Sequence, residues 1–563
     1  MPSNNHYQRQ IRMNVIETIQ LAFILYLETN FNVDPQLLAS CDFSLNIEEG
    51  KQNFGDLNSN AALILAKHLQ RNPREVAQKI ASEFTHGYIS SLEPAGPGFL
   101  NFTLTRQALH YLTTDLLIAK ETFFKLNPDE KKHNFSLEFV SANPTGPLHL
   151  GNGRGGIIGD VLANVLKFIG HKATKEFYIN DAGSQIKKLG LSFKTRYLQA
   201  TGHDSAMPED GYHGSYLVDI ARDLVTEQGG DLADKPDEFF AEYAKDKILA
   251  MIQETLKEYG IEFDVWFSER HLHANGAIEA ALALLDKRGY LYTQDDAVWF
   301  KSTAFGDDKD RVVKKSSGEL TYAAADIAYL VNKAERGFDR LIIILGHDHH
   351  SYAVRLQTIL QALDLESHPQ LSVILYQLVK MKVQGEQMRM SKRAANIVTL
   401  KDVIETVGKD VARFFYLNRK ADAQLEFDLD LAMKKTDENP VYYIQYAYVR
   451  INSILEKAQE IDDFKNITEA DTSHIGLHEA LLIKKIVSLK QTLKTISLNS
   501  HTHLLANYTI ELATFFHKYY THNRVIDLEN IAQSRSRLLL ITLVRDTLAT
   551  SFDLLGISKP EKM

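Results

Sequence analysis

Cysteine is almost absent from this sequence: Cys41 is the single cysteine among 563 residues. One thiol cannot form a disulfide within the chain or supply a cysteine-based zinc site, so both are excluded. The shortage of cysteine fits a reducing cytoplasm, and we expect a cytoplasmic protein. Long apolar runs are also missing. The segment Leu21–Leu27 is too short to span a bilayer and lacks a cleavage-site pattern, so we expect neither a membrane anchor nor a signal peptide.

An excess of positive charge is missing as well. The formal net charge is −9 at pH 7, which argues against a protein that coats nucleic acid generally. Residues 431–563 carry 16 Lys and Arg against 15 Asp and Glu, so the negative excess lies upstream. A protein that reads one structured RNA needs local basic grooves rather than a basic average. An RNA ligand is therefore not excluded. The apolar content of 44% and charged content of 24% are those of a soluble globular protein.

The most informative segment is residues 138–160. An apolar run, Phe135–Val140, ends in a Pro/Gly turn, and His149-Leu-Gly-Asn152 then opens a Gly-rich helix that we expect to be amphipathic. Unpaired backbone N–H groups point out of a first helical turn, so a strand, a tight turn and a helix start form an anion site. We expect the glycines here to let a phosphate ligand approach the backbone; they are Gly151, Gly153, Gly155 and Gly156.

The pattern of elements divides the chain into three parts. Residues 1–115 mix helical stretches with short strands, as in an α+β domain. Residues 116–430 alternate strands and helices, which favours a parallel α/β sheet, with an insertion at about 195–290. Residues 431–563 have a helical period, which predicts a helical bundle. The strands expected in the second part are Phe135–Val140, Ala173–Tyr178, Ala297–Phe300, Arg340–Leu345 and Ser372–Tyr376.

Two distant motifs carry a resemblance to a known class. His149-Leu-Gly-Asn152 after a strand resembles the HIGH signature of class I aminoacyl-tRNA synthetases, and Arg389-Met-Ser-Lys-Arg393 resembles their KMSKS loop. The flanks of both motifs are similar to the corresponding segments of the arginyl-tRNA synthetases. Phe177–Gly183 and Gly346–His350 share this similarity. The resemblance extends over roughly residues 50 to 563. It implies a Rossmann-like catalytic domain between an N-terminal α+β domain and a C-terminal α-helical bundle.

The resemblance implies a two-step reaction. L-Arginine attacks the α-phosphate of ATP to give arginyl-adenylate, and the arginyl group passes to the 3′ end of tRNA(Arg). Catalysis is then mostly positioning and charge stabilisation. Implied partners are L-arginine, tRNA(Arg) and ATP with its Mg²⁺, and a monomer is expected. His149, Asn152 and Lys392 are the implied catalytic residues. Asn152 stands where the family usually has a second His and cannot carry a positive charge, so we expect weaker stabilisation there or compensation by Arg154.

The implied ATP-binding residues fall at both motifs and at one further strand end. Gly346 would permit close approach of the adenosine, and Asp348 would accept from the ribose hydroxyls with help from His349. Three histidines within His347–His350 cannot all point at one ion from a strand end, so no metal site is expected there. The remaining implied ATP-binding residues are Gly151, Arg389 and Ser391.

The implied arginine-binding residues are mostly acidic or amide. Tyr322 and Asp326 are four residues apart, which places both on one helix face beside a guanidinium. A lone Asp is more often a surface carboxylate, which is the alternative for Asp326. Glu269 is a second implied guanidinium partner. The resemblance assigns the α-amino end of the substrate to Glu138, Asn143 and Gln377, and we expect Gln377 to lie on a strand, Ile374–Leu378.

The implied tRNA-binding residues lie in the third part, in Asn439–Arg450. They are Tyr442, Gln445, Tyr446 and Arg450. Aromatic and Arg side chains could stack on anticodon bases, but aromatics at helical spacing are more often core, and we expect about half to be core. Residues 1–115 would grip the tRNA elbow, or form a small domain without a site.

Two alternatives remain. Another enzyme of the class is disfavoured, because a cysteinyl enzyme needs zinc-binding cysteines and a glutamyl enzyme needs cations around its substrate. The second alternative is a catalytically impaired, synthetase-like RNA-binding or regulatory protein. Loss of His149 or Lys392 would have favoured it, and the departure at Asn152 is the one feature that does.

Overall fold

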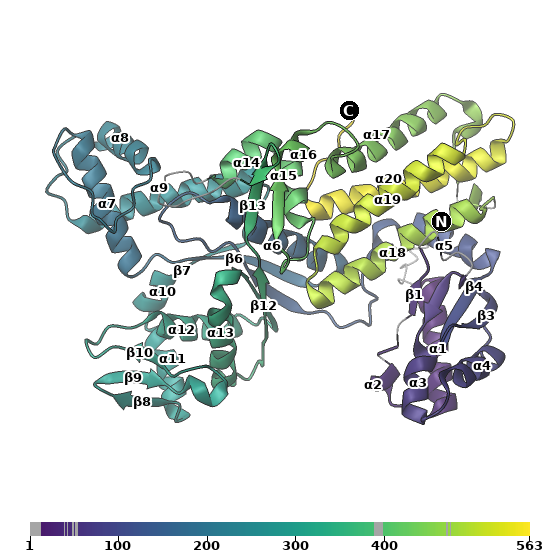
Figure 1. Cartoon of the computed structure of the whole chain (residues 1–563), viewed down its shortest axis with the longest axis horizontal. Coiled ribbons are helices and arrows are strands. Elements are labelled where there is room, and N and C mark those ends of the chain that lie inside the picture. The colour runs from purple at the N-terminus through teal and green to yellow at the C-terminus, as the bar shows by residue number, and fades with distance from the viewer. Residues whose placement is uncertain are drawn as a thin grey trace, which may run out of the picture.

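The computed structural model describes residues 13–38, 40–41, 43–47, 50, 54–387, 398–468, 471–472 and 474–563. Four β-sheets lie within these residues. They are the sheet of the N-terminal domain, the central parallel sheet and two small three-stranded sheets. Figure 1 shows an N-terminal domain at the lower right, a helical bundle above it and a central sheet between the bundle and a helical arm. Within the described residues, no helix is apolar over enough of its length to cross a membrane.

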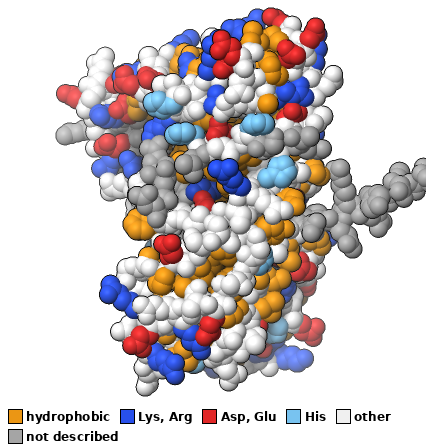
Figure 2. Space-filling model, turned by 90° about the vertical axis from the view of Figure 1, so that its right-hand side faces the viewer, with side chains coloured by type: hydrophobic (Ala, Val, Ile, Leu, Met, Phe, Trp, Pro, Cys, Tyr) orange, Lys and Arg blue, Asp and Glu red, His pale blue; other side chains and the backbone are white. Residues whose placement is uncertain are grey.

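The N-terminal domain is an antiparallel sheet covered by helices, as expected for an α+β domain. Its strand order is β1-β2-β4-β3. Exposed hydrophobic side chains occur on this domain, including Leu21 and Phe54. Figure 2, which views the molecule from the right-hand side of Figure 1, shows hydrophobic side chains gathered over the lower half of the molecule. The elements are α1 (Val15–Phe31), α2 (Pro35–Leu38), β1 (Phe43–Leu45), β2 (Leu57–Ser59), α3 (Ala61–Leu69), α4 (Pro73–Glu83), β3 (Ile89–Ala95), β4 (Phe99–Leu104), α5 (Arg106–Ala119) and the 3₁₀ helix η2 (Lys120–Phe124).

The central sheet is parallel throughout, with strand order β12-β11-β5-β6-β7. The chain builds outwards from β5 through β6 to β7, then crosses to the other side of β5 to form β11 and β12. The strand order therefore reverses between β5 and β11, the crevice where open α/β sheets bind ligands. The bounds are β5 (Asn134–Glu138), β6 (Lys172–Ile179), β7 (Val265–Ser268), β11 (Arg340–Gly346) and β12 (Gln370–Tyr376).

Four of the five expected strands are confirmed as members of this sheet. The fifth, Ala297–Phe300, is confirmed as a strand (β9), but it is not a member of the parallel sheet. It pairs antiparallel with β8 (Leu291–Gln294) and β10 (Arg311–Lys314) in a separate sheet. This sheet packs with nearby helices into a second hydrophobic core. Those helices are α10 (Glu269–Ala274), α11 (Ala277–Lys287), α12 (Tyr322–Glu335) and α13 (His350–Leu363), with 3₁₀ helices η3 (Ser302–Phe305) and η4 (His347–His349).

The expected insertion at residues 195–290 contains helices of the arm at the left of Figure 1, but it also contains β7 of the central sheet. The arm is built from α7 (Ser184–Ala200), α8 (Tyr216–Gln228) and α9 (Asp237–Glu258).

After the central sheet the chain forms a small three-stranded sheet and then the bundle. The helical period expected within residues 431–563 is confirmed in α18 (Leu477–Asn499). The small sheet has β13 (Val379–Val383), β14 (Glu386–Gln387) and β15 (Leu425–Asp428), beside α14 (Leu400–Val407), α15 (Lys409–Leu417) and α16 (Leu429–Met433). The other bundle elements are α17 (Pro440–Gln459), η6 (Asp462–Phe464), α19 (His503–His522) and α20 (Ile531–Leu555).

One buried arginine joins the bundle, the arm and the central α/β unit. Arg413 of α15 is fully buried and donates from Nε to the Leu555 carbonyl at 2.8 Å and from Nη1 to the Tyr259 carbonyl at 2.9 Å. Its Nη2 lies 2.5 Å from Oδ2 of Asp160 on α6 (Leu150–Ile169). The ends of α20 and α9 are thereby tied to the helix that follows β5.

Candidate active site

The helix α6 starts at the motif found in the sequence. His149 is its N-cap, and Nδ1 of His149 accepts from the Gly151 N–H at 3.1 Å. The Asn152 side chain accepts from the His149 N–H through Oδ1 at 3.0 Å, which closes a capping box. His149 is exposed at this helix start. Both residues therefore fix the helix terminus. The N–H groups of Leu150, Gly151 and Asn152 donate to the Val398 carbonyl, His149 Nδ1 and the His149 carbonyl, so the expectation of unpaired N–H groups in this first turn was wrong.

Three of the α6 glycines lie against side chains of the protein, so the expectation that they admit a phosphate was wrong for these three. A Cβ on Gly153 would lie 2.7 Å from a Leu400 methyl, and one on Gly155 would lie 2.7 Å from the Tyr376 ring. One on Gly156 would lie 3.0 Å from an Ile261 methyl. Most of α6 is buried rather than amphipathic, which corrects a second expectation. Its glycines let other parts of the protein pack tightly against it.

Arg154 does not point at the anion site. It is fully buried, and its two terminal nitrogens donate at 2.8 Å each to the carbonyls of Gln377 and Lys420. Burial lowers the pKa of Arg154 to about 10, so it remains charged at neutral pH. The expected compensation for Asn152 by Arg154 is therefore wrong. Arg154 instead fixes the backbone after β12, a role that no local sequence signal indicates.

The second motif, Arg389–Arg393, lies outside the described residues. Residues 388–397, with Arg389, Ser391 and Lys392, are not described. The residues that follow them pair directly with the first motif. The Leu150 N–H donates to the Val398 carbonyl at 3.1 Å, and the Leu400 N–H donates to the Leu148 carbonyl at 2.8 Å. Thr399 forms a β-bridge with His149. The segment that follows residues 388–397 therefore runs beside the start of α6.

Three carboxylates from distant parts of the chain lie buried near each other. Glu138 ends β5, Glu269 begins α10 and Asp326 is on α12, with exposed fractions of 7%, 4% and 9%. Burial raises the pKa of Asp326 to about 6, against the opposing effects of Arg355 and Tyr352, and the charges of Glu269 and Glu138 raise it further. Burial also raises the pKa values of Glu138 and Glu269. The structure therefore brings together the three acidic residues that the sequence singled out.

Asp326 has a donor on one oxygen and only an ion pair on the other. Tyr352 donates to Oδ1 at 2.8 Å. Oδ2 lies 3.5 Å from Nε of Arg355, yet neither of these two buried atoms makes a hydrogen bond. Glu269 is paired with His273, with Oε1 3.6 Å from Nε2, and is hydrogen-bonded to Tyr178. An acceptor that is buried and unsatisfied favours a ligand with N–H donors.

The backbone turns sharply after Glu138. Val140 and Ser141 have φ values of +66° and +37°, a region that β-branched residues rarely adopt. Ser141 then contacts Glu138 through Oγ at 3.4 Å, and the same Oγ accepts from the Tyr178 N–H at 3.1 Å. The turn links the carboxyl ends of β5 and β6 directly under the acidic cluster. Non-glycine residues held in this region often mark functional sites.

The other expected arginine-binding residues lie at the edges of the cluster. Tyr322 is 48% exposed and Asn143 is exposed, so neither is held inside the protein. Gln377 follows β12 rather than lying within a strand, which corrects its expected position. Its N–H donates to the Ala421 carbonyl at 2.9 Å.

The expected nucleotide residues follow β11, beside the reversal of strand order. A Cβ on Gly346 would lie 2.6 Å from Oδ1 of Asp348, but this oxygen ends an exposed side chain that can move aside, so the contact does not by itself require glycine. Nε2 of His349 lies 3.7 Å from Oδ2 of Asp348. Among the described residues, no group of three or more His, Cys, Asp or Glu is placed to hold a metal ion.

The expected tRNA residues form part of an aromatic surface on α17. The Tyr442 and Tyr446 rings stack with centroids 6.2 Å apart, and the Arg450 guanidinium lies 4.5 Å from the Tyr446 centroid and 5.2 Å from that of Tyr520. Gln445 instead donates inward, to Oδ2 of Asp410 at 3.1 Å.

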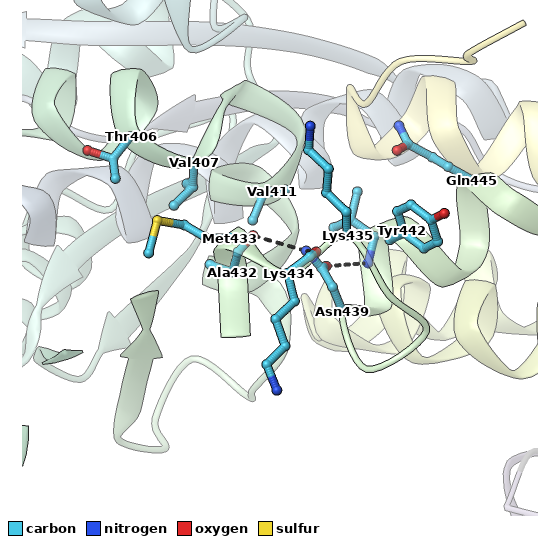
Figure 3. A pocket seen from close by; sticks show the side chains of 11 residues that line it. Thr406, Val407, Val411, Ala432, Met433, Lys434, Lys435, Asn439, Tyr442 and Gln445 are labelled. Carbon is cyan, nitrogen blue, oxygen red and sulfur yellow. Dashed lines mark hydrogen bonds between the residues drawn. The ribbon is translucent and has the colours of Figure 1, made fainter. Parts of the chain in front are cut away.

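A cavity of about 360 Å³ adjoins this surface. Figure 3 shows Tyr442 and Gln445 of α17 on one side of it, with Lys434 and Lys435 from the segment before α17 close by. Aliphatic side chains line much of the cavity, but its two lysines and its tyrosine offer the positive charge and the ring face that favour nucleic acid.

Three protein families match successive stretches of the chain. The family described as tRNA synthetases class I (R), catalytic domain, matches residues 113–426, more than half of the chain. The arginyl tRNA synthetase N terminal domain family matches residues 10–104, and the DALR anticodon binding domain family matches residues 444–563.

Individual relatives share this similarity over nearly their whole length. An arginine–tRNA ligase of Oceanobacillus iheyensis is 42% identical over 516 residues, covering 90% of this chain and 92% of the relative. One of Bacillus subtilis is 42% identical over 519 residues, covering 91% and 93%. The solved structure of a putative arginyl-tRNA synthetase from Campylobacter jejuni matches with a TM-score of 0.75 at 35% identity, covering 82% of this chain and all of that one. The chain therefore belongs to the arginyl-tRNA synthetase family.

Proposed function

We propose that this chain is an arginine–tRNA ligase that activates L-arginine with ATP and transfers the arginyl group to the 3′ end of tRNA(Arg). The observation that carries the proposal is the meeting of buried Glu138, Glu269 and Asp326 at the carboxyl edge of the central sheet. The reversal of strand order and the start of α6 lie at that same edge.

The triphosphate would lie at the start of α6. His149 would donate to its oxygens from Nε2, because its Nδ1 accepts from the Gly151 N–H, and the amide nitrogen of Asn152 is left to donate because its oxygen serves the cap. Lys392 would supply a point charge to the departing pyrophosphate, with Ser391 and Arg389 beside it. The pairing of Val398 with Leu150 supports this placement. Mg²⁺ would enter with ATP, held mainly by the phosphates.

The arginine side chain would occupy the acidic cluster. Its guanidinium offers N–H groups to the unsatisfied Oδ2 of Asp326 and to Glu269, with the exposed Tyr322 closing over it. Glu138, Asn143 and Gln377 would hold the α-amino end. Adenosine would lie by Gly346, with Asp348 and His349 at its ribose. A carboxylate that leaves one buried oxygen for a planar cation selects arginine over lysine.

The tRNA would contact the two ends of the chain. We assign residues 1–115 to the tRNA elbow and residues 431–563 to the anticodon, leaving 116–430 as the catalytic domain. The exposed Tyr446 and the guanidinium of Arg450 support the second assignment, because bases stack on aromatic and guanidinium planes. Tyr442 and Gln445 would act beside the adjoining cavity. A cytoplasmic monomer completes the proposal.

Pyrophosphate exchange tests this proposal. Each of the twenty amino acids would be offered with ATP, with and without total tRNA. We expect only arginine to support exchange, and mainly with tRNA present. A response to another amino acid would refute the specificity. Binding of tRNA without exchange for any amino acid would instead favour a catalytically impaired RNA-binding protein.

A further inference from the structure

A buried network lies directly behind Glu138. Tyr329 and Lys333 follow Asp326 on α12 by three and seven residues, so all three lie along one side of the helix. The Tyr329 hydroxyl lies 2.9 Å from Oε2 of Glu138 and also contacts Oε1 of Glu176 on β6. Lys333, fully buried, lies 2.7 Å from Oε1 of Glu176 and 3.3 Å from Oε2 of Glu138.

A proton count shows why this arrangement matters. A phenol has one proton, yet the Tyr329 oxygen contacts two carboxylates. Burial favours the neutral form of Glu176, but Lys333 and Arg336 outweigh it and lower its pKa to about 2, so Glu176 is ionised. If Tyr329 donates to Glu176, Glu138 must carry a proton to bond the phenol oxygen. If Tyr329 turns its proton to Glu138, that carboxylate can be ionised.

We propose that Tyr329, backed by Glu176 and Lys333, is a positioning residue for arginine: it orients the Glu138 carboxylate and sets the pH range in which Glu138 accepts a cation. The proposal rests on the arginine-binding role proposed above for Glu138. In the empty pocket Glu138 holds a proton and donates to Tyr329, which donates to Glu176. On arginine binding the Glu138 proton leaves to solvent, and the Tyr329 hydroxyl rotates to donate to the ionised Glu138.

The groups facing Glu138 act on its proton in known directions. Burial raises its pKa, Lys333 lowers it, Glu176 raises it, and the hydrogen bond from Tyr329 lowers it. Asp326 and Tyr352 also lie within electrostatic range, and Ser141 contacts Oε1. Removing the Tyr329 hydroxyl and removing the Glu176 charge should therefore move the pKa of Glu138 in opposite directions. A network that only supports the fold has no reason to produce that opposition.

Steady-state exchange over a range of pH tests this in the full chain with tRNA present. Tyr329→Phe should raise KM for arginine about tenfold or more, because it removes a hydrogen bond to a charged group, and change KM for ATP by less than about twofold. The acidic limb of the arginine KM profile should move to higher pH in Tyr329→Phe and to lower pH in Glu176→Gln.

Tyr197→Phe is a matched control. It removes another buried tyrosine hydroxyl, bonded at 2.8 Å to the Gly229 carbonyl in the arm, and should leave both KM values unchanged. The proposal is overturned if Tyr329→Phe leaves the arginine KM and its pH limb in place, or raises the KM for ATP equally. Limbs moving the same way would also overturn it. If Glu176→Gln fails to fold, Tyr329→Phe decides alone. A wild-type protein that shows no arginine-dependent exchange would refute the proposed function itself.

Discussion

Acidification should weaken arginine binding through Asp326. This carboxyl is 9% exposed, and burial raises its pKa to about 6 although Arg355 and Tyr352 oppose the rise. The ionised form is the one that pairs with a guanidinium. Because the pKa is raised, the ionised form is present above about pH 6 and is lost as pH falls through that value.

The size of the effect follows from the ionised fraction. With a pKa of about 6, the fraction is about 0.9 at pH 7, 0.5 at pH 6 and 0.1 at pH 5. KM for arginine should therefore rise about tenfold between pH 7 and pH 5. A carboxyl with an ordinary pKa of about 3.9 would still be about nine-tenths ionised at pH 5 and would give almost no change.

The assay is arginine-dependent pyrophosphate exchange with tRNA at constant ionic strength. Asp326→Asn should raise the arginine KM by at least about tenfold at pH 7, since a charge-assisted hydrogen bond is lost, and should remove its share of the acidic limb. Asp219→Asn changes a carboxyl that is exposed on the arm and is the matched control. An arginine KM that is constant from pH 7 to pH 5, or a full limb in Asp326→Asn, would refute the reasoning.

Three further changes test other parts of the structure. Asn152→Ala should lower the unfolding free energy by about 1 kcal/mol in urea denaturation because it opens the capping box, and no loss would contradict that geometry. Gly159→Ala should cost about 2 kcal/mol or more, since its Cβ would lie 2.2 Å from the Phe139 ring, whereas Gly87→Ala meets nothing within 4 Å and should be near neutral. Tyr446→Ala should raise KM for tRNA about tenfold without changing that for arginine; an unchanged tRNA KM would remove it from the interface.

The sequence predicted the central sheet where local and tertiary signals agree. Leu341–Leu345 is a continuous apolar run, and the structure buries Leu341–Ile344 in β11 between β5 and β12. Ala297–Phe300 shows where this reasoning stops. Its residues favour a strand, and it is one, but the sheet that it joins depends on distant partners that no local period encodes.

The candidate site could likewise be predicted from the sequence only in part. Glu138, Glu269 and Asp326 were indicated by motifs around each residue, and the structure brings them together. The groups behind them were not indicated. Tyr329 and Lys333 have the spacing of one helix side, but nothing local shows that this side faces β5 and β6. Their contacts depend on how α12 packs on the sheet.

The predictions that the α6 glycines admit a phosphate and that Arg154 compensates for Asn152 were wrong for a related reason. A Gly-rich helix start is equally suited to a nearby phosphate and to tight packing, and the neighbours of each position decide between them. The Tyr376 ring fills the space beside Gly155, and carbonyl groups of the chain satisfy Arg154. His149 and Asn152, by contrast, stand at the start of the helix and form its capping box.

The acidic cluster contradicts the general rule that carboxylates stay at the surface, and that conflict explains its chemistry. Burying charge is costly, and the protein offsets part of the cost with Lys333 beside Glu138 and Arg355 beside Asp326. The offset is incomplete, because the pKa values of these carboxyls remain raised. A substrate with a guanidinium and an ammonium group supplies the missing positive charge. Without a bound ligand, the negative charge of the cluster is therefore only partly compensated. Binding of a ligand that carries two positive charges completes the compensation.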